Sequence, residues 1–307
     1  MKRILEIAER GTSLRILDGT LSVQPPEQPE FSVPPEDLVS VLLSTPAASL
    51  TGAALVALAA ADVPVVVCDG RHFPCGLFVP FAGKSDQTRV LAGQIAASAP
   101  VRKRLWQKLV RAKLEGQAAV LDLAGDPEAR SLDALADRVR SGDADNAEAT
   151  GARIYWHALG LFPARVRGAA DANRLLDYAY TVLASLCARA VCAAGLHPGL
   201  GLRHANGRNA FCLAWDLVEP FRAAADCAVL AWLRDHPGET MLTPEAKRHL
   251  VRETLGATFR IGGRVEEPDG AAEHAAVALR EALLAGDATL FSPPRFEWHG
   301  EEASKCG

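Results

Sequence analysis

The sequence predicts an α+β fold in which a small β-rich N-terminal domain is followed by a larger all-helical domain. Short apolar runs separated by turn residues fill about the first ninety residues, a pattern typical of strands, and long amphipathic segments follow them. The chain has 307 residues, about twice the usual single-domain length of roughly 150 residues. We therefore expect a β-rich domain over residues 1–85, a linker over 86–95 and a helical domain over 96–307.

The clearest element of the N-terminal domain is a β-hairpin. The dipeptide Asp18-Gly19 separates two short apolar runs and is one of the strongest short-range hairpin signals. A two-residue turn there pairs Ile16 with Leu21 and Leu14 with Val23, so that all four side chains lie on one face. The other elements expected here are strands over residues 4–8, 38–43 and 63–68, a proline-rich loop over 24–35 and a short helix over 51–61.

The helical domain is predicted from apolar residues that recur at helical spacing. Residues 101–117 place Leu105, Leu109 and Leu114 near that spacing, and Trp106 widens the apolar stripe. Further helices are expected over residues 173–194, 211–234 and 271–284.

Charge is distributed unevenly along the chain. The net charge of −4 argues against a uniformly basic nucleic-acid-binding protein. Residues 101–117 nevertheless carry six bases and one acid, and residues 150–222 carry eight arginines and four acids. The protein can therefore present a positive face to a phosphate backbone, the alternative being a set of solvated helix faces. The bases expected to contact phosphate are Arg102, Lys103, Arg104, Lys108, Arg111 and Lys113.

Disulfide, zinc and membrane signatures are not found in the sequence. The seven cysteines are scattered, and no two have the Cys-x-x-Cys spacing of a structural zinc site. The most apolar stretch, residues 47–61, is too short and too rich in alanine to cross a bilayer. The N-terminal residues lack the apolar run of a signal peptide. We therefore expect a cytoplasmic protein without membrane contact.

Three acids on one predicted helix indicate a possible functional site. Asp216, Glu219 and Asp226 fall at i, i+3 and i+10 of an otherwise apolar segment, roughly on one face. Buried carboxylates are costly unless they are paired with cations or bound to a metal. A polar turn over residues 141–148 and a glycine-rich loop over 195–204 carry further candidate side chains.

Glu148, His204 and Glu219 could converge as two carboxylates and one imidazole. That donor set suits Mg²⁺ or Mn²⁺, although the spacing matches no local metal motif. In the alternative interpretation His204 is a capping or solvated loop residue, and Asp216 and Glu219 form ion pairs. The candidate partners for such pairs are Arg203, Arg208 and Arg222.

Several motifs, in their order and separations, resemble the CRISPR-associated integrase family that captures new spacers. They are Asn146-Ala147-Glu148, residues 152–156, residues 173–180, residues 195–201 with His204, and residues 216–222 with Asp226. The resemblance covers residues 1 to about 230. Two further motifs, His72-Phe73-Pro74 and Leu105-Trp106-Gln107, are most similar to the form found in type II systems.

The resemblance implies a metal-dependent DNA endonuclease and integrase. Glu148, His204 and Glu219 would be the catalytic metal ligands for Mg²⁺ or Mn²⁺, Asp216 and Asp226 would be acids beside the site, and a phosphate contact would come from Arg222. The reaction would be phosphoryl transfer, in which the 3′-hydroxyl of a captured DNA fragment attacks a phosphodiester at the edge of a CRISPR repeat. With water as the nucleophile the same site would cleave DNA.

The resemblance also implies partners. These are double-stranded DNA, both as spacer precursor and as CRISPR repeat, and a second copy of the chain in a homodimer formed mainly by the first ninety residues. Two such dimers would flank a dimer of a small ferredoxin-like CRISPR-associated protein with a nuclease fold, giving a heterohexamer. Two alternatives stay open: a non-catalytic helical DNA-binding or scaffold protein whose acids form ion pairs, and a metal-dependent hydrolase of small phosphoesters.

Overall fold

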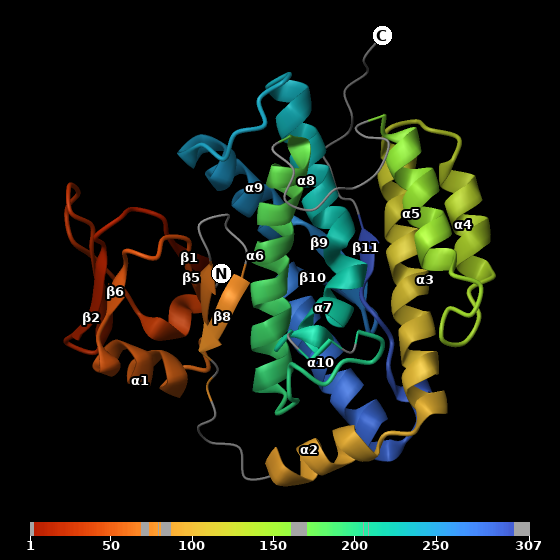
Figure 1. Cartoon of the computed structure of the whole chain (residues 1–307), viewed down its shortest axis with the longest axis horizontal. Coiled ribbons are helices and arrows are strands. Elements are labelled where there is room, and N and C mark those ends of the chain that lie inside the picture. The colour runs from red at the N-terminus through yellow and green to blue at the C-terminus, as the bar shows by residue number, and fades with distance from the viewer. Residues whose placement is uncertain are drawn as a thin grey trace.

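The computed structural model describes residues 3–68, 74–78, 80, 87–160, 171–204, 206–207 and 209–297. Strands dominate the N-terminal part and helices the remainder, so the predicted α+β class is confirmed. In Figure 1 the β-rich part lies beside helix α6 (Ala172–Ala193), and helices α3 (Ala99–Leu123), α4 (Ala129–Asp137) and α5 (Ala147–Ala158) lie on the far side of α6. His72 and Phe73 of one sequence motif, and Arg208, a candidate ion-pair partner, lie outside the described residues.

Two four-stranded sheets form the N-terminal part. The first has the order β1-β5-β7-β8, in which the first three strands are parallel and the last is antiparallel to its neighbour. The second has the order β4-β3-β2-β6. The strands are β1 Arg3–Ile7, β2 Ser13–Leu17, β3 Thr20–Gln24, β4 Phe31–Val33, β5 Leu38–Leu43, β6 Ser49–Leu50, β7 Val65–Cys68 and β8 Pro74–Phe78.

The predicted hairpin is present in the predicted register. Strands β2 and β3 pair Ile16 with Leu21 and Leu14 with Val23. Asp18 and Gly19 both have positive φ angles, as a type I′ turn requires. The expected loop over residues 24–35 is only partly correct, because its last third forms β4 at the edge of this sheet.

The apolar side chains between the two sheets make a separate small core with helix α1 (Gly52–Ala60). Thr51 caps that helix by accepting a hydrogen bond from the backbone N–H of Ala54 at 3.2 Å. Alternate residues of β5 face opposite sides: Val41 packs in this small core, whereas Leu42 packs against the helical part. The first sheet therefore joins the two parts of the chain.

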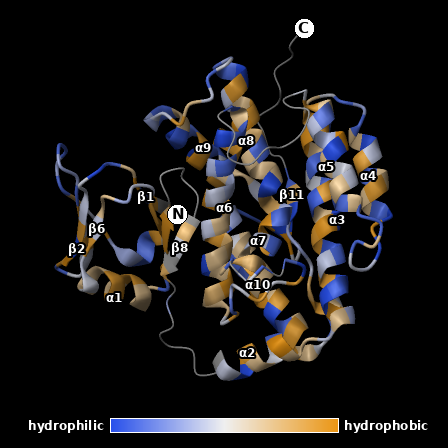
Figure 2. Ribbon diagram, viewed as in Figure 1, coloured by the Kyte–Doolittle hydropathy of each residue, from blue (hydrophilic) through white to orange (hydrophobic). Residues whose placement is uncertain are grey.

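Helices form the rest of the described chain, and α6 runs through their centre. Nearly every residue of α6 is buried. It is long and apolar enough to meet the length and composition criteria for a membrane span, but its most apolar window is completely buried inside the protein, as expected for a core helix. The other helices are α2 Gln87–Ala96, α3 Ala99–Leu123, α4 Ala129–Asp137, α5 Ala147–Ala158, α7 Cys212–Val218, α8 Arg222–Asp235, α9 Pro244–Gly256 and α10 Pro268–Ala285. Figure 2 shows hydrophilic and hydrophobic residues alternating along these helices, the pattern of helices with one buried side.

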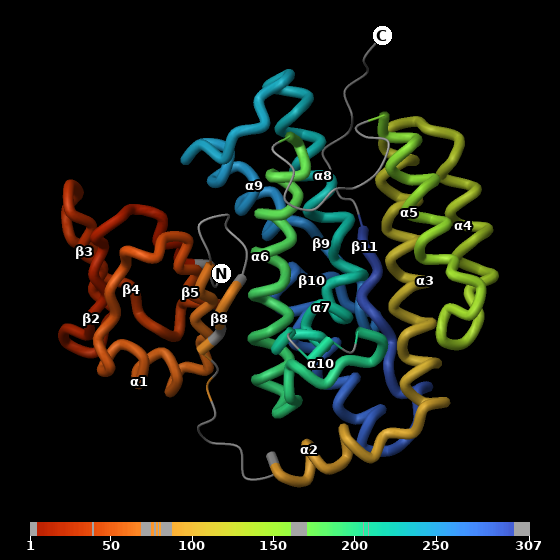
Figure 3. The backbone as a smooth tube through the Cα atoms, viewed as in Figure 1, coloured from red at the N-terminus to blue at the C-terminus, as the bar shows by residue number. Residues whose placement is uncertain are grey.

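Three features of this part differ from the expectations. The segment expected as a linker over 86–95 is occupied by α2, which packs on α10 and leads directly into α3 at the bottom of Figure 3. The helical part also contains a three-stranded sheet, β10-β9-β11 (Arg264–Glu266, Thr258–Ile261 and Arg295–Glu297), so it is not all-helical. The helix expected over 211–234 is interrupted by a 3-10 turn, η2 (Glu219–Phe221), because Pro220 lacks the N–H that a continuous helix needs.

Candidate active site

Glu148 is held in the first turn of α5. The side chain of Asp143, in the polar turn before the helix, accepts hydrogen bonds from the backbone N–H groups of Ala147 at 2.7 Å and Glu148 at 3.2 Å. These bonds satisfy donors that have no partner within the helix. Farther along α5, Gly151 lies so close to α3 that a Cβ atom there would be 2.1 Å from Leu114. The close approach brings the Glu148 side chain onto α3.

His204 belongs to a loop that is held by Asp216 of α7. The Asp216 carboxylate, 0% exposed, accepts hydrogen bonds from the backbone N–H groups of Leu202 at 2.6 Å and Arg203 at 3.2 Å. It also binds Nδ1 of the His204 ring at 2.5 Å. The loop turns tightly against α7: a Cβ on Gly201 would lie 2.3 Å from the backbone oxygen of His204 in the same loop and 3.0 Å from Cys212 Cβ of α7. Asp216 therefore positions the imidazole and leaves Nε2 as the ring nitrogen for a ligand.

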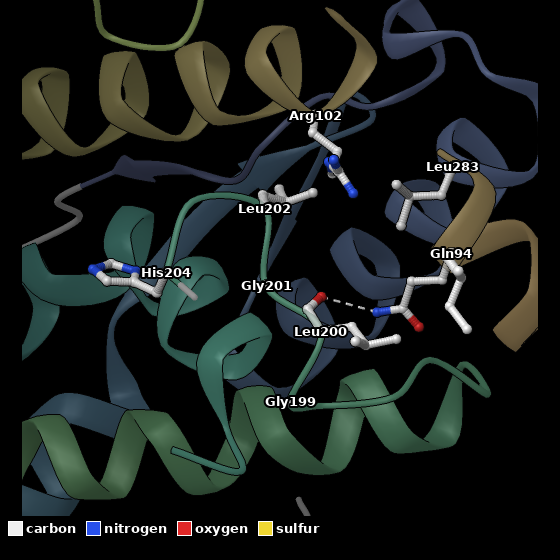
Figure 4. Close-up of a pocket in the computed structure, with 9 residues that line it drawn as sticks. Gln94, Arg102, Gly199, Leu200, Gly201, Leu202, His204 and Leu283 are labelled. Atoms are coloured by element: carbon white, nitrogen blue, oxygen red, sulfur yellow. Dashed lines mark hydrogen bonds between the residues drawn. The ribbon is translucent and has the colours of Figure 1, made fainter. Parts of the chain in front are cut away.

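The other side of this loop is held by Gln94 of α2. Its Nε2 donates to the carbonyl oxygens of His197 at 3.0 Å and Leu200 at 3.1 Å, and its Oε1 accepts from the His197 N–H at 2.9 Å. Figure 4 shows Gln94 and His204 on opposite sides of the loop, with Arg102 beside a pocket between them. The sequence gives no signal for Gln94, because its partners lie more than one hundred residues away.

Glu219 is buried at the start of η2 and is bound by two cations. Arg222 contacts both of its oxygens, with Nε 2.9 Å from Oε2 and Nη2 3.0 Å from Oε1. The Nζ of Lys113, on α3, lies 2.7 Å from Oε2. Burial opposes the ionisation of Glu219, but Arg222 and Lys113 outweigh it and lower the pKa of this carboxyl to about 2. Glu219 is therefore a carboxylate at neutral pH.

Lys113 connects the two predicted carboxylate ligands. Its Nζ also lies 2.7 Å from Oε1 of Glu148, and its side chain is only 9% exposed. Burial works against its charge, yet Glu219 and Glu148 together raise the pKa of Lys113. The helical spacing contained a signal for this position, because Trp106, Leu109 and Lys113 fall on one buried stripe of α3.

Three bases of the expected phosphate-binding row on α3 already have partners within the protein. Lys113 is buried between acids, and Lys108 donates to the backbone oxygens of Ala288 at 2.8 Å and Phe291 at 2.6 Å. Arg111 is bound to two acids, Glu115 at 2.8 Å and Asp137 at 2.6 Å. Exposed or half-exposed bases are found nearer the start of the helix: Arg102, Lys103 and Arg104.

The three acids of the predicted stripe have separate partners. Asp216 holds the His204 loop, and Glu219 binds the two cations described above. Asp226, on α8, accepts hydrogen bonds from the hydroxyl groups of Tyr155, at 2.9 Å, and Tyr180. Arg222 stacks over the Tyr180 ring, 4.4 Å from its centroid. Arg222 thus contacts Glu219 and Tyr180, an arrangement that fits a clamp on Glu219 better than the phosphate contact expected from the sequence.

His204 lies close enough to both predicted carboxylate ligands to sense their charge. The hydrogen bond that His204 donates to Asp216 is the main cause of the raised pKa of His204; burial opposes the shift, and Glu219 and Glu148 add to it. Within the described part of the chain, no three His, Cys, Asp or Glu side chains form a group that could hold a metal ion as they stand. The donor types nevertheless fit Mg²⁺ or Mn²⁺, because Glu148 and Glu219 already converge on one cation and an oriented imidazole is nearby.

Solved structures with the same fold include a casposase and Cas1 proteins. A casposase bound to its integration product matches with a TM-score of 0.83 and 20% identity, covering 98% of this chain and 96% of that chain. The chain of a Cas6-RT-Cas1–Cas2 complex matches with a TM-score of 0.76 and 18% identity, covering 98% of this chain and 36% of that chain. The chain therefore has the fold shared by these proteins.

Sequence comparison identifies the family. The model of the CRISPR associated protein Cas1 family matches residues 5–253. The CRISPR-associated endonuclease Cas1 of Neisseria meningitidis is 36% identical over 222 residues, which cover 72% of this chain and 73% of the relative. The chain belongs to the Cas1 family, as the motifs predicted.

Proposed function

We propose that this Cas1-family chain is a metal-dependent DNA endonuclease and integrase that inserts captured DNA fragments into a CRISPR repeat array. The observation that carries the proposal is the meeting of Glu148 and Glu219 at one cation, beside an imidazole oriented by a buried carboxylate. The names of the relatives support it: an endonuclease in the sequence match and a casposase with its integration product in the structural match.

Glu148, His204 and Glu219 are the proposed ligands of Mg²⁺ or Mn²⁺. When bound, the ion would polarise the scissile phosphate and stabilise charge that develops on its oxygens. Asp216 accepts a hydrogen bond from Nδ1–H of His204 and so selects the tautomer of the neutral ring in which the Nε2 lone pair can bind the ion. Arg222 fixes the orientation of Glu219 through two hydrogen bonds.

The proposed reaction is phosphoryl transfer without a covalent enzyme intermediate. The 3′-hydroxyl of a captured fragment would attack a phosphodiester at the edge of a repeat; as its oxygen forms the new P–O bond and gives up its proton, the existing P–O bond to one side of the repeat strand breaks and that strand leaves with a hydroxyl end. With water as the attacking group, the same site would act as an endonuclease. The nature of the attacking oxygen depends on how the DNA is placed, because both reactions need the same charge stabilisation.

The proposed partners follow from the charge distribution and the family. Double-stranded DNA would contact Arg102, Lys103 and Arg104, the bases at the start of α3 that remain accessible. Two homodimers, each formed mainly by the first ninety residues, would flank a dimer of a small ferredoxin-like protein. The structural match to a Cas1–Cas2 complex supports such a partner. A cytoplasmic location suits these substrates.

The test is an integration assay with a 3′-hydroxyl DNA fragment and a supercoiled plasmid that carries a repeat. We expect joining in Mn²⁺, none in EDTA, and none with Glu148→Gln or His204→Ala. Glu245→Gln removes an exposed carboxylate on α9 and is the matched control, with full activity expected. Joining that survives chelation, or that Glu148→Gln leaves undiminished, contradicts the proposal.

The ion pairs of Glu219 also fit the competing interpretation, a DNA-binding or scaffold protein without catalysis. The same assay separates the two: a scaffold protein binds branched DNA but neither cuts nor joins it in any divalent metal. A hydrolase of small phosphoesters would instead cleave p-nitrophenyl phosphate and leave DNA intact.

A further inference from the structure

The cation that lies between the predicted ligands Glu148 and Glu219 is the side-chain ammonium group of Lys113. Lys113 Nζ is 2.7 Å from Glu148 Oε1 and 2.7 Å from Glu219 Oε2, and those carboxylates come from different elements, α5 and η2. An ammonium nitrogen at that distance from two oxygens lies where a divalent ion bound by the same two oxygens would lie, since typical Mg²⁺–oxygen distances are only about 0.6 Å shorter.

The carboxylates around Lys113 are already neutralised by cations of the protein, so a divalent ion would have to compete with them. Two carboxylates, Glu148 and Glu219, face two cations, Lys113 and Arg222, so the group is electrically neutral. Both oxygens of Glu219 are already hydrogen-bonded: Oε2 accepts from Lys113 and Arg222, and Oε1 accepts from Arg222. Oε2, the oxygen bound to Lys113, already accepts two hydrogen bonds, so a metal that binds this oxygen must displace one of its two donors.

Lys113 is the donor that can leave. Arg222 is held by two hydrogen bonds to Glu219 and by stacking on Tyr180, whose hydroxyl binds the buried Asp226. Two salt bridges hold the Lys113 ammonium group, which a flexible four-carbon stem carries. Moving it aside exposes one lone pair on each of the two carboxylates and changes the charge of the group from zero to minus one.

We propose that Lys113 is a built-in counter-ion of the metal site: it holds Glu148 and Glu219 together in the metal-free protein and withdraws when the divalent ion binds. This inference rests on the proposed metal site. It makes Lys113 a positioning residue that competes with the metal, so metal binding is coupled to a movement of one side chain and is weaker than the bare donor set would give.

The first test measures Mn²⁺ binding by isothermal titration calorimetry. Lys113→Met keeps the length of the side chain and removes its charge, and Arg111→Met removes a charge from the exposed side of the same helix as a control. We expect Lys113→Met to bind Mn²⁺ roughly tenfold more tightly, within the range usual for coupling between two sites, and Arg111→Met to bind as wild type. Unchanged or weaker binding by Lys113→Met overturns the inference.

The second test needs no variant and covers the case in which Lys113→Met fails to fold. Lysine acetylation of the wild-type protein is quantified by mass spectrometry with and without Mn²⁺. Lys113 should become several-fold more reactive with Mn²⁺, whereas Lys247, a buried lysine paired with Glu6 on another side of the molecule, should not change. Equal labelling of Lys113 in both conditions overturns the inference.

Glu148→Gln separates this inference from the metal site on which it rests. Suppose that wild type binds Mn²⁺, that Glu148→Gln does not, and that Lys113→Met binds Mn²⁺ with the same affinity as wild type. The metal site then stands, and the proposed role of Lys113 is refuted. If wild type binds no Mn²⁺, or Glu148→Gln binds it as wild type does, the metal site itself is refuted and the inference is refuted with it.

Discussion

Removing the Asp216 carboxylate should loosen the His204 loop without disturbing the rest of the fold. Asp216 is completely buried. It accepts hydrogen bonds from three groups of the loop: the Leu202 N–H at 2.6 Å, the Arg203 N–H at 3.2 Å and His204 Nδ1 at 2.5 Å. Asp216→Ala leaves all of these donors without an acceptor. Asp216→Asn keeps the shape but turns an amide N–H₂ toward one of them.

The magnitude follows from the number and strength of these bonds. A hydrogen bond to a charged group contributes about 1.5–3 kcal/mol to stability, and two of the three bonds are short. The His204 side chain is 47% exposed, so freed donors regain water and the lower end of that range applies to each short bond. We expect Asp216→Ala to lower the free energy of unfolding by about 3 kcal/mol and Asp216→Asn by about half of that.

The pH dependence has a definite sign. Asp216 raises the pKa of His204 above 6.5, so the charge part of the stabilisation is complete below pH 6.5 and is lost as the pH rises through the higher pKa of the folded protein. The stability gap between wild type and Asp216→Asn should therefore narrow from pH 6 to pH 9. Mn²⁺ binding should strengthen over the same interval, because the metal and the proton compete for Nε2.

Urea unfolding followed by tryptophan fluorescence measures these differences. Asp235→Asn, which removes an exposed carboxylate paired with Arg234, is the control and should unfold at the same urea concentration as wild type. A loss below about 0.5 kcal/mol for Asp216→Ala, or a stability gap between wild type and Asp216→Asn that does not depend on pH, would show that the Asp216 carboxylate does not hold the loop.

Three further predictions concern the same site. Gln94→Ala releases the other side of the His204 loop and should weaken Mn²⁺ binding, measured by calorimetry, on the order of tenfold. Its thermal melting curve should stay close to that of wild type. An unchanged Mn²⁺ affinity contradicts this prediction. Gly201→Ala forces the backbone at His204 to move and should abolish integration. The variant should still fold, as circular dichroism would show. Retained joining would contradict the close contact between Gly201 and the His204 backbone. Glu219→Gln leaves Lys113 buried with one charged partner fewer and should lower the free energy of unfolding in urea by roughly 3 kcal/mol at pH 7. Because the pKa of Glu219 is about 2, the difference from wild type should shrink as the pH falls from 4.5 toward 2. A difference that stays constant over this range refutes the ion pairs.

The sequence predicts those parts of the fold that local signals determine. The register of the β2–β3 hairpin follows from Asp18-Gly19 and from the alternation of apolar residues on both sides. The sheet β10-β9-β11 was missed because its strands have three or four residues, and β11 pairs with a strand more than thirty residues earlier. Short strands carry too few residues for a periodic pattern.

The candidate site likewise has a part that the sequence predicts and a part that it does not. The sequence points to Glu148, His204 and Glu219 as candidates because polar residues in apolar or glycine-rich surroundings need an explanation, and because they match the motifs of a family. Whether a given base of α3 faces solvent or an acid depends on α5 and η2, which the sequence of α3 does not contain. Lys113 was consequently assigned to DNA, although its position on the apolar stripe pointed inward.

Helix α6 presents two tyrosines to opposite sides. Residues two positions apart on a helix point about 200° away from each other; Tyr178 binds Glu6 of β1 at 2.5 Å, and Tyr180 binds Asp226 beside the candidate active site. Helix α6 thus contacts both the β-rich part and the residues around the candidate active site. Any movement of the β-rich part relative to α6 would have to change the Tyr178–Glu6 contact and the buried Ser40–Ser185 hydrogen bond. Through α6, the packing of the β-rich part is therefore linked to the position of Tyr180 beside Asp226.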